Sequence, residues 1–311
     1  MQKKYKGTRE AFGQSLYDLV SNDPNVVLVS ADSLKSTRAT KVAEDYPDNY
    51  IECGIAEQLS VNVAAGLTTE GLIPFVATYA GFLTMRACEQ MRTFIAYPNL
   101  NVKIIGMNGG MAGGEREGCT HQFYEDVAIV SAIPNYTILL PADGPQTYHA
   151  IQMAYEIKGP VYVRIGSGRE TDVYDYDTPF SETGIRVLKS EGMDILLLSS
   201  GFVLNRVMQA ADILIEKGHK VTVADVNIIT DNPSEEIINL LKEAGKIFTF
   251  EDHNINGGVG SYIASLVSEH SPKHVYKTGL KTFAESGPAS ELLDKYGFAP
   301  QDIVDKVCSY T

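Results

Sequence analysis

Several signatures of common protein classes are missing from this chain of 311 residues. Its four cysteines are scattered and form no C-x-x-C pair, so neither a secreted disulfide framework nor a cysteine-rich metal site is expected. No H-E-x-x-H sequence is present, and we expect no zinc site built by this chain alone. No apolar run approaches about 18 residues, which argues against a transmembrane helix. These absences favour a globular protein of a reducing compartment, the cytoplasm.

Positive charge is also scarce. The chain has 26 lysine and arginine residues against 39 aspartate and glutamate residues, which gives a net charge of −13. Such a surface disfavours nucleic acids and anionic membranes as partners, although one local basic pocket for a phosphate stays compatible with it. The basic N-terminus is followed by no apolar run, so we do not interpret it as a signal peptide.

Strands and helices are expected to alternate through the first half. Apolar, β-branched runs predict strands at 25–31, 73–79, 101–106, 136–141 and 161–165. The stretches between them predict helices at 55–67, 82–97 and 143–157. This alternation is typical of a parallel sheet covered by helices on both faces.

A polar segment rich in glycine, proline and acidic residues, 166–179, then interrupts the pattern. Alternation resumes with strands expected at 194–199, 220–225 and 246–251, and with helices expected at 204–214, at 234–244 and after 257–260. The length suits roughly two domains. We therefore predict an α/β protein with two mostly parallel sheets, each covered by helices on both faces: domain 1–168, linker 169–184 and domain 185–311.

One carboxyl group stands out in the first half. A short apolar run ends at Gly54, and Glu57 follows three residues later, where a helix is expected to begin. Ile55, Ala56 and Leu59 flank it, so we expect this group to be removed from water. Burial disfavours the charged form of a carboxyl group, which can then hold or share a proton. On spacing alone, a helix-start glutamate that interacts with the helix dipole is the simpler interpretation.

Glycine supplies six of the thirteen residues between 106 and 118, directly after a predicted strand. Such a loop lets backbone N–H groups approach a ligand, and it matches neither the P-loop nor the dinucleotide pattern. Glu117 and His121 follow, and the histidine is either a proton shuttle or hydroxyl ligand, or a loop histidine bonded to backbone. Tyr79 and Phe82, beyond another strand, either stack on a planar heterocycle or belong to the core.

In combination, these motifs resemble the pyrimidine-binding half of transketolase, while two later segments resemble its C-terminal domain. The match is collinear over nearly the whole chain. It implies a thiamine-diphosphate-dependent transferase that moves a two-carbon ketol unit from a ketose to an aldose, as in the pentose phosphate pathway. The segments that carry the resemblance are Ile-Ala-Glu57-Gln, Thr-Tyr79-Ala-Gly-Phe82, Glu117-Gly-Cys-Thr-His121-Gln, Glu251–Gly260 and Glu285–Ala289.

The resemblance implies a role for each matching residue. Glu57 is expected to bond the ring nitrogen of the thiamine aminopyrimidine, which promotes the imino tautomer that deprotonates the thiazolium carbon. Phe82 is expected to stack on the pyrimidine, with Tyr79 as the adjoining wall. His121 falls on a histidine that bonds substrate hydroxyls, and Glu117 falls on an aspartate of the donor site.

Three further positions are implied as ligands of a sugar phosphate: Arg9, Ser36 and Arg169. Guanidinium groups suit phosphate because they present paired donors. Arg169 matches only with a one-residue insertion, and Arg164 is the alternative for the same role.

The chain also departs from the family pattern. Gly109 or Gly110 stands where transketolases often have a phosphate-binding histidine, and Met85 replaces an aromatic residue of the pyrimidine pocket. Glu117 is one methylene longer than the aspartate of the family. The cofactor stays implied, whereas the donor is left open between ketose phosphates and free ketoses.

The resemblance further implies that this chain supplies half of an active site. The Gly-Asp-Gly…Asn signature that holds the diphosphate and Mg²⁺ is absent from the sequence. An N-terminal transketolase subunit is therefore expected as partner, with no metal ligands on this chain and no activity from this chain alone. We expect a heterotetramer of two chains of each kind, or a homodimer with an exposed apolar docking face when the chain is isolated.

Other enzymes with the same cofactor are alternatives. 1-Deoxyxylulose-5-phosphate synthase shares Ile-Ala-Glu-Gln and Thr-His-Gln, but it has Asp-Arg where this chain has Met107–Gly110. The beta subunit of 2-oxo acid dehydrogenases has a similar two-domain plan without Gly-x-Thr-His-Gln. A non-catalytic scaffold subunit is the alternative outside the enzymes, and the retained Glu57, aromatic residues and His121 argue against it.

Overall fold

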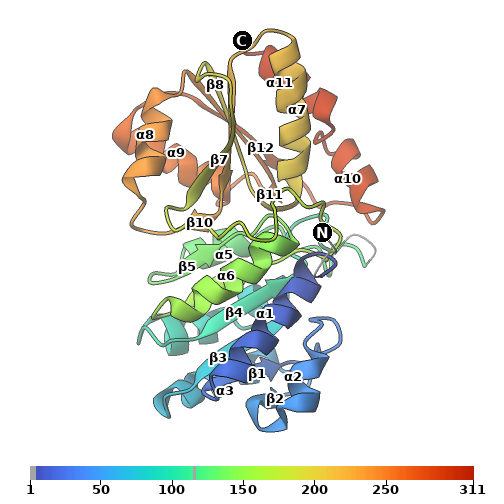
Figure 1. Cartoon of the computed structure of the whole chain (residues 1–311), viewed down its shortest axis with the longest axis vertical. Helices are drawn as coiled ribbons and strands as arrows, with labels where there is room; N and C mark the ends of the chain where they lie inside the picture. The colour runs from blue at the N-terminus through green and yellow to red at the C-terminus, as the bar shows by residue number, and fades with distance from the viewer. Residues whose placement is uncertain (1–4, 115–116) are drawn as a thin grey trace.

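The computed structural model describes residues 5–114 and 117–311, and it confirms the predicted α/β architecture. Two sheets lie one above the other, each flanked by helices (Figure 1). The predicted start of the first domain, residues 1–4, lies outside the described part. In that part no helix has both the length and the apolar character needed to cross a membrane.

The first sheet has the strand order β10-β5-β6-β4-β3-β1-β2. All neighbours are parallel except β10, which pairs antiparallel with β5 although it comes from the C-terminal half. The strands are β1 (Val26–Ser30), β2 (Tyr50–Glu52), β3 (Ile73–Tyr79), β4 (Lys103–Met107), β5 (Thr137–Leu139), β6 (Val161–Arg164) and β10 (Ile228–Ile229). Every residue of β1, β4 and β6 is buried, as expected for strands covered on both faces.

Helices cover both faces of this sheet. They are α1 (Thr8–Asn22), α2 (Thr40–Asp45), η1 (Pro47–Asn49), α3 (Glu57–Thr69), η2 (Phe82–Arg86), α4 (Cys88–Gln90), η3 (Met91–Ala96), α5 (Asp126–Ser131) and α6 (Gly144–Glu156). The helices α1 and α6 pack together, while α3 packs against β3, η2 and η3. The helix expected over 82–97 is present, but η2 and η3 are π-helical, a geometry that often occurs at functional sites.

The second sheet has the order β12-β11-β8-β9-β7, parallel except for the antiparallel pair β7 and β9. Its strands are β7 (Ile185–Ser190), β8 (Ile195–Ser199), β9 (Val221–Val226), β11 (Lys246–Asn254) and β12 (Val275–Leu280). Its helices are η4 (Gly201–Val203), α7 (Leu204–Glu216), α8 (Glu235–Glu243), α9 (Val259–His270), α10 (Ala289–Lys295) and α11 (Pro300–Cys308). In Figure 1, α8 and α9 lie on one side of this sheet and α7, α10 and α11 on the other.

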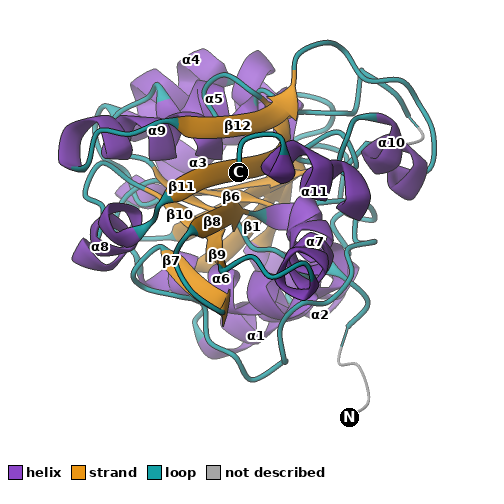
Figure 2. Cartoon of the chain, turned by 90° about the horizontal axis from the view of Figure 1, so that it is seen from above, coloured by secondary structure: helices purple, strands orange, loops and turns teal. Residues whose placement is uncertain are grey.

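The segment between β6 and β7 contains no helix or strand, but it is packed and not a loose tether. Asp143, at the start of α6, accepts the backbone N–H groups of Val173 at 2.7 Å and Tyr174 at 2.8 Å. The Tyr174 hydroxyl donates to Asp225 of β9 at 2.7 Å. Viewed from above, the second sheet lies over the first (Figure 2). The segment thus holds the two sheets together at their junction.

Candidate functional site

Most of the predicted site residues lie at or after the carboxyl ends of β1, β2, β3 and β4, whereas Arg9 lies on α1 and Arg169 follows β6. Open parallel sheets bind ligands at this edge. Gly54, with φ of 68°, turns the chain after β2, and Glu57 is the first residue of α3. Glu57 is only 2% exposed. Ile55 and Leu59, expected to shield it, are instead 76% and 50% exposed, because α3 turns another face, with Val61, toward the sheet.

The side chain that meets Glu57 is Arg86, which the sequence analysis did not single out. Its Nη1 donates to Glu57 Oε1 at 2.6 Å. Glu57 Oε2 is buried and has no hydrogen-bond partner. The Arg86 guanidinium carbon also lies 4.5 Å from the centre of the Phe82 ring, in a cation–π contact. The four-residue spacing of Phe82 and Arg86 within one helical segment is the sequence signal that indicates this cation–π contact.

An aromatic cluster adjoins this carboxylate. The Tyr79 and Phe82 ring centres are 5.5 Å apart, and the His121 ring lies 5.2 Å from Tyr79 and 5.3 Å from Phe82. Phe123, which the sequence analysis missed, lies 5.3 Å from Phe82. Gly81 makes room for it, because a Cβ atom there would collide with the Phe123 ring. The structure thus brings together residues predicted from two distant motifs.

A polar group of residues borders the cluster. The Tyr79 hydroxyl donates to Ser36 Oγ at 3.2 Å. Arg9 donates to the side-chain oxygen of Asn108, a buried residue held in the left-handed region with φ of 58°. Burial lowers the pKa of the Arg9 guanidinium, and the negative charge of nearby Glu117 opposes that shift. Arg9 therefore lies near both Tyr79 and Glu117, and Ser36 contacts Tyr79 directly.

Two of the predicted site residues, Met85 and Arg169, are exposed to solvent. Met85 is 46% exposed on η2, between Phe82 and Arg86. Arg169 is exposed in the linker and lines a depression of about 330 Å³ together with α7 and α10 residues. A cavity of about 700 Å³ lies elsewhere, beside Tyr136 and Tyr262, and none of the predicted site residues lines it.

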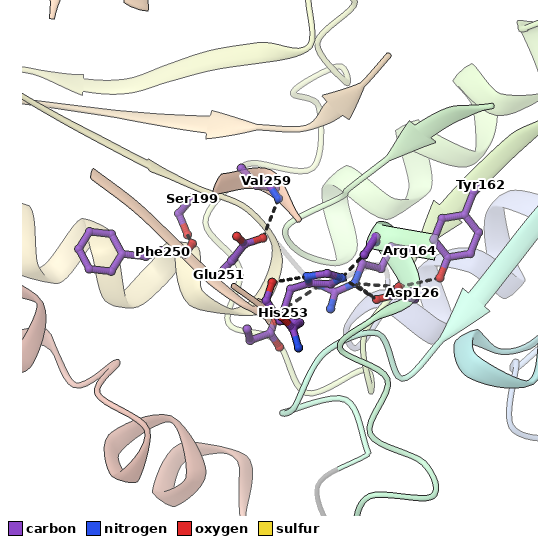
Figure 3. Close-up of polar contacts among 11 residues, drawn as sticks. Asp126, Tyr162, Arg164, Ser199, Phe250, Glu251, His253 and Val259 are labelled. Atoms are coloured by element: carbon purple, nitrogen blue, oxygen red, sulfur yellow. Dashed lines mark hydrogen bonds and ion pairs between the residues drawn. The ribbon is translucent and has the colours of Figure 1, made fainter. Parts of the chain in front are cut away.

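Arg164, the alternative phosphate ligand, belongs to a buried ionic cluster between the two sheets (Figure 3). Its Nε lies 3.0 Å from Asp126 Oδ2, and its Nη1 lies 3.2 Å from Asp252 Oδ1 on β11. Tyr162 donates to the same Asp126 oxygen at 2.7 Å, and His253 Nε2 is 3.8 Å from Asp126 Oδ1. Arg164 is 8% exposed and both aspartates are buried. These contacts favour Arg169 over Arg164 as the residue that can reach a phosphate.

The same cluster explains why glycine stands at both 109 and 110, one of which is the position where the resemblance implies a histidine. A Cβ atom on Gly109 would collide with the Arg164 side chain, and one on Gly110 would collide with the Asp252 carboxylate. Gly110 also has φ of 90°, which disfavours any other residue. The ionic cluster therefore fills the volume that a side chain at either position would need.

Two buried carboxyl groups near the junction predict how stability depends on pH. Burial raises the pKa of Asp225 and of Glu251 to about 7 each. Between their unfolded values near 4 and these folded values, the folded chain binds protons that the unfolded chain does not. We therefore expect these two groups to add about 1 kcal/mol each to the free energy of unfolding as the pH falls from about 8 to 6.5. Buried Lys103 and His253 act in the opposite direction, because burial lowers their pKa values to about 7 and about 4.

Urea unfolding at several pH values in this window measures the effect. The Glu251→Gln variant is expected to gain about 1 kcal/mol less than the wild type over this window, because the contribution of Glu251 is gone. A variant whose free energy of unfolding varies with pH as that of the wild type does would contradict this prediction.

Comparisons with known proteins agree with this architecture. The family model of the transketolase pyrimidine-binding domain matches residues 4–168, and that of the transketolase C-terminal domain matches residues 184–303. The chain is 34% identical over 307 residues to a putative transketolase C-terminal section of Methanocaldococcus jannaschii, covering 97% of this chain and 96% of that protein. It is 34% identical over 296 residues to a subunit of the apulose-4-phosphate transketolase of Phocaeicola vulgatus, covering 95% of this chain and 94% of that protein.

Among solved structures, the chain is similar to a split gene transketolase described as an inactive beta4 tetramer. The TM-score is 0.86 and the sequence identity 36%, and the match covers 98% of both chains.

Proposed function

The chain belongs to the transketolase family, and we propose that it is the pyrimidine-binding subunit of a split transketolase. The reaction would transfer a two-carbon ketol unit from a ketose or ketose phosphate to an aldose or aldose phosphate. The observation that carries the proposal is the buried Glu57 carboxylate with one oxygen unpartnered, directly beside the ring cluster of Tyr79, Phe82 and His121. The division into domains 1–168 and 185–311 with a linker at 169–184 is part of this proposal.

The residues present fit thiamine diphosphate. Glu57 Oε2 is a buried oxygen without a partner, which suits the ring nitrogen of an aminopyrimidine when the two atoms share one proton. Phe82 offers an aromatic surface beside it, Tyr79 a second wall and Met85 an adjoining apolar side chain. When bound, the cofactor would supply the electron sink for cleaving a carbon–carbon bond next to a carbonyl.

Other residues would act on the sugar. His121 is half-buried at the edge of the rings, where it could donate or accept a proton at a substrate hydroxyl. Arg9, Ser36, Glu117 and Arg169 would bind the remaining polar groups of the sugar, with the two guanidinium groups suited to a phosphate. We leave the donor sugar open, since a relative is named for apulose 4-phosphate.

A partner subunit would complete the site. Among the residues that the structure describes, five of the eight exposed large hydrophobic side chains lie on α3, η2 and η3 or just beside these helices, and Glu57 begins α3. We call this set the apolar face: Ile55, Leu59, Met85, Phe94 and Tyr97. Such a concentration is typical of a protein–protein interface. We propose that an N-terminal transketolase subunit covers the apolar face and binds the diphosphate and Mg²⁺, in a heterotetramer.

Reconstitution tests the proposal. We expect no ketol transfer from the pure chain and measurable transfer after it is mixed with its partner, thiamine diphosphate and Mg²⁺, assayed with a panel of ketose phosphates and free ketoses. A second arm with pyruvate and glyceraldehyde 3-phosphate tests the deoxyxylulose-phosphate synthase alternative. Activity of the single chain, an inactive mixture, or a mixture that is active only in the pyruvate arm would overturn the proposal.

A further inference from the structure

Arg86 is placed to control the carboxylate on which the proposed function depends. It ends η2, whereas Glu57 begins α3, so the two residues are 29 positions apart and meet only in the folded chain. Arg86 Nη1 engages one Glu57 oxygen at 2.6 Å, and the other oxygen stays buried without a partner. Arg86 therefore bonds only one oxygen of the Glu57 carboxylate, whereas arginine and carboxylate groups commonly form a bidentate pair with two parallel hydrogen bonds.

The electrostatics of the pair are asymmetric as well. Glu57 is 2% exposed, so an ionised carboxylate at this position depends on a nearby cation to offset its lost hydration. The Arg86 side chain is 48% exposed and keeps much of its own hydration. The contact therefore matters more to the buried Glu57 carboxyl group than to the half-exposed Arg86 side chain.

The ring of Phe82 fixes where the cation lies. The guanidinium carbon is 4.5 Å from the ring centre, on the residue four positions earlier in the same helical segment. Cation–π contact and the ion pair together hold a side chain that is otherwise half in solvent. Arg86 is thereby held between the carboxylate and the ring that would stack on a heterocycle.

We propose that Arg86 is a positioning residue that holds Glu57 Oε1, so that Oε2 stays free to share one proton with the pyrimidine ring nitrogen. This inference rests on the proposed function. Arg86 touches no reacting atom in it and acts only through Glu57. An uncharged residue at this position would replace the charge-assisted hydrogen bond to Oε1 by a weaker one, so the carboxyl group could rotate and Oε2 would no longer be held toward the ring nitrogen.

The experiment measures cofactor affinity by calorimetry in the complex of this chain with its partner subunit, with Mg²⁺ present. Thiamine diphosphate is compared with an analogue whose ring nitrogen facing Glu57 is replaced by C–H. The variants are Arg86→Gln, Arg86→Lys and a matched control, Arg92→Gln, which alters an exposed arginine on η3.

We expect Arg86→Gln to bind thiamine diphosphate about 10- to 100-fold more weakly, as for the loss of a charge-assisted hydrogen bond. The analogue is expected to lose less than about threefold, because it makes no such bond. Arg86→Lys keeps the charge and should recover part of the affinity, and Arg92→Gln should bind as the wild type does.

Equal losses for both ligands would mean that Arg86 only supports the structure, and unchanged affinity for both would remove its role altogether. Either result overturns the inference while leaving the proposed function intact. A wild-type complex that binds neither ligand would instead overturn the proposed function. Urea unfolding of each variant, with Arg86→Lys as the milder substitution, separates these outcomes from a folding defect.

Discussion

Glu57→Gln is expected to lower the turnover of the reconstituted complex by about 10²- to 10³-fold, the usual consequence of removing one preorganised electrostatic contact. Glutamine has nearly the same shape, but it carries no charge and cannot exchange a proton with the ring nitrogen. The loss should appear in kcat, measured by steady-state ketol transfer at saturating cofactor.

Folding should hardly change in this variant. A carboxylate in the first turn of a helix contributes only about 0.3–1 kcal/mol to it, and the Arg86 group left behind is half in solvent. Urea unfolding of the isolated chain measures this. Glu70→Gln, an exposed carboxyl group at the other end of α3, is the matched control and should leave turnover unchanged. Turnover of Glu57→Gln within tenfold of the wild type would contradict the assigned role.

The largest loss of stability is expected from Arg164→Met. The substitution leaves Asp126 and Asp252 without their shared cation, although both are fully buried. Removing one partner of a buried ion pair typically costs about 3–5 kcal/mol, because an uncompensated charge stays in the interior. Urea unfolding monitored by circular dichroism measures this loss.

A surface ion pair supplies the control. Lys189 pairs with Asp212, which is 57% exposed, so Lys189→Met should cost less than about 1 kcal/mol. The double variant Arg164→Met/Asp252→Leu should recover part of the stability lost by Arg164→Met, because it removes one of the two unpaired charges. A cost below about 1 kcal/mol for Arg164→Met alone would contradict this account of the junction.

Local patterns predicted much of the fold. The strand expected at 73–79 is β3 without any shift, because a continuous apolar run between a glycine-containing turn and the next helix specifies a buried strand. On α7, Leu204, Val207, Ala211 and Leu214 are buried as the helical spacing predicts. The motifs of the predicted site could also be identified in the sequence, because Glu57, Tyr79, Phe82 and His121 lie at or after the ends of strands, in the order that the family pattern has.

Other features depend on residues that are far apart in the chain. The strand β10 has two residues and pairs with β5 of the other half, and so short a segment has no periodicity to detect. The Arg86–Glu57 pair joins two helices, and η2 has to be wound as a π-helix to place Arg86 where it is. Arg164 was the alternative to Arg169 as a phosphate ligand, and the second sheet supplies Asp252 as its buried partner.

The sequence by itself therefore determined the alternation of strands and helices and the edge of the sheet at which most of the predicted site residues gather. Those properties follow from local hydrophobic spacing and from short motifs, which act within a few residues. Only the tertiary structure decided the charge environment of those residues: the cation beside Glu57, the ring of Phe123 and the ionic cluster under Gly109 and Gly110. Electrostatic pairing and burial depend on which distant segments pack together. For Glu57 and Phe123 these are segments of the first domain, and for the ionic cluster they are the two docked sheets.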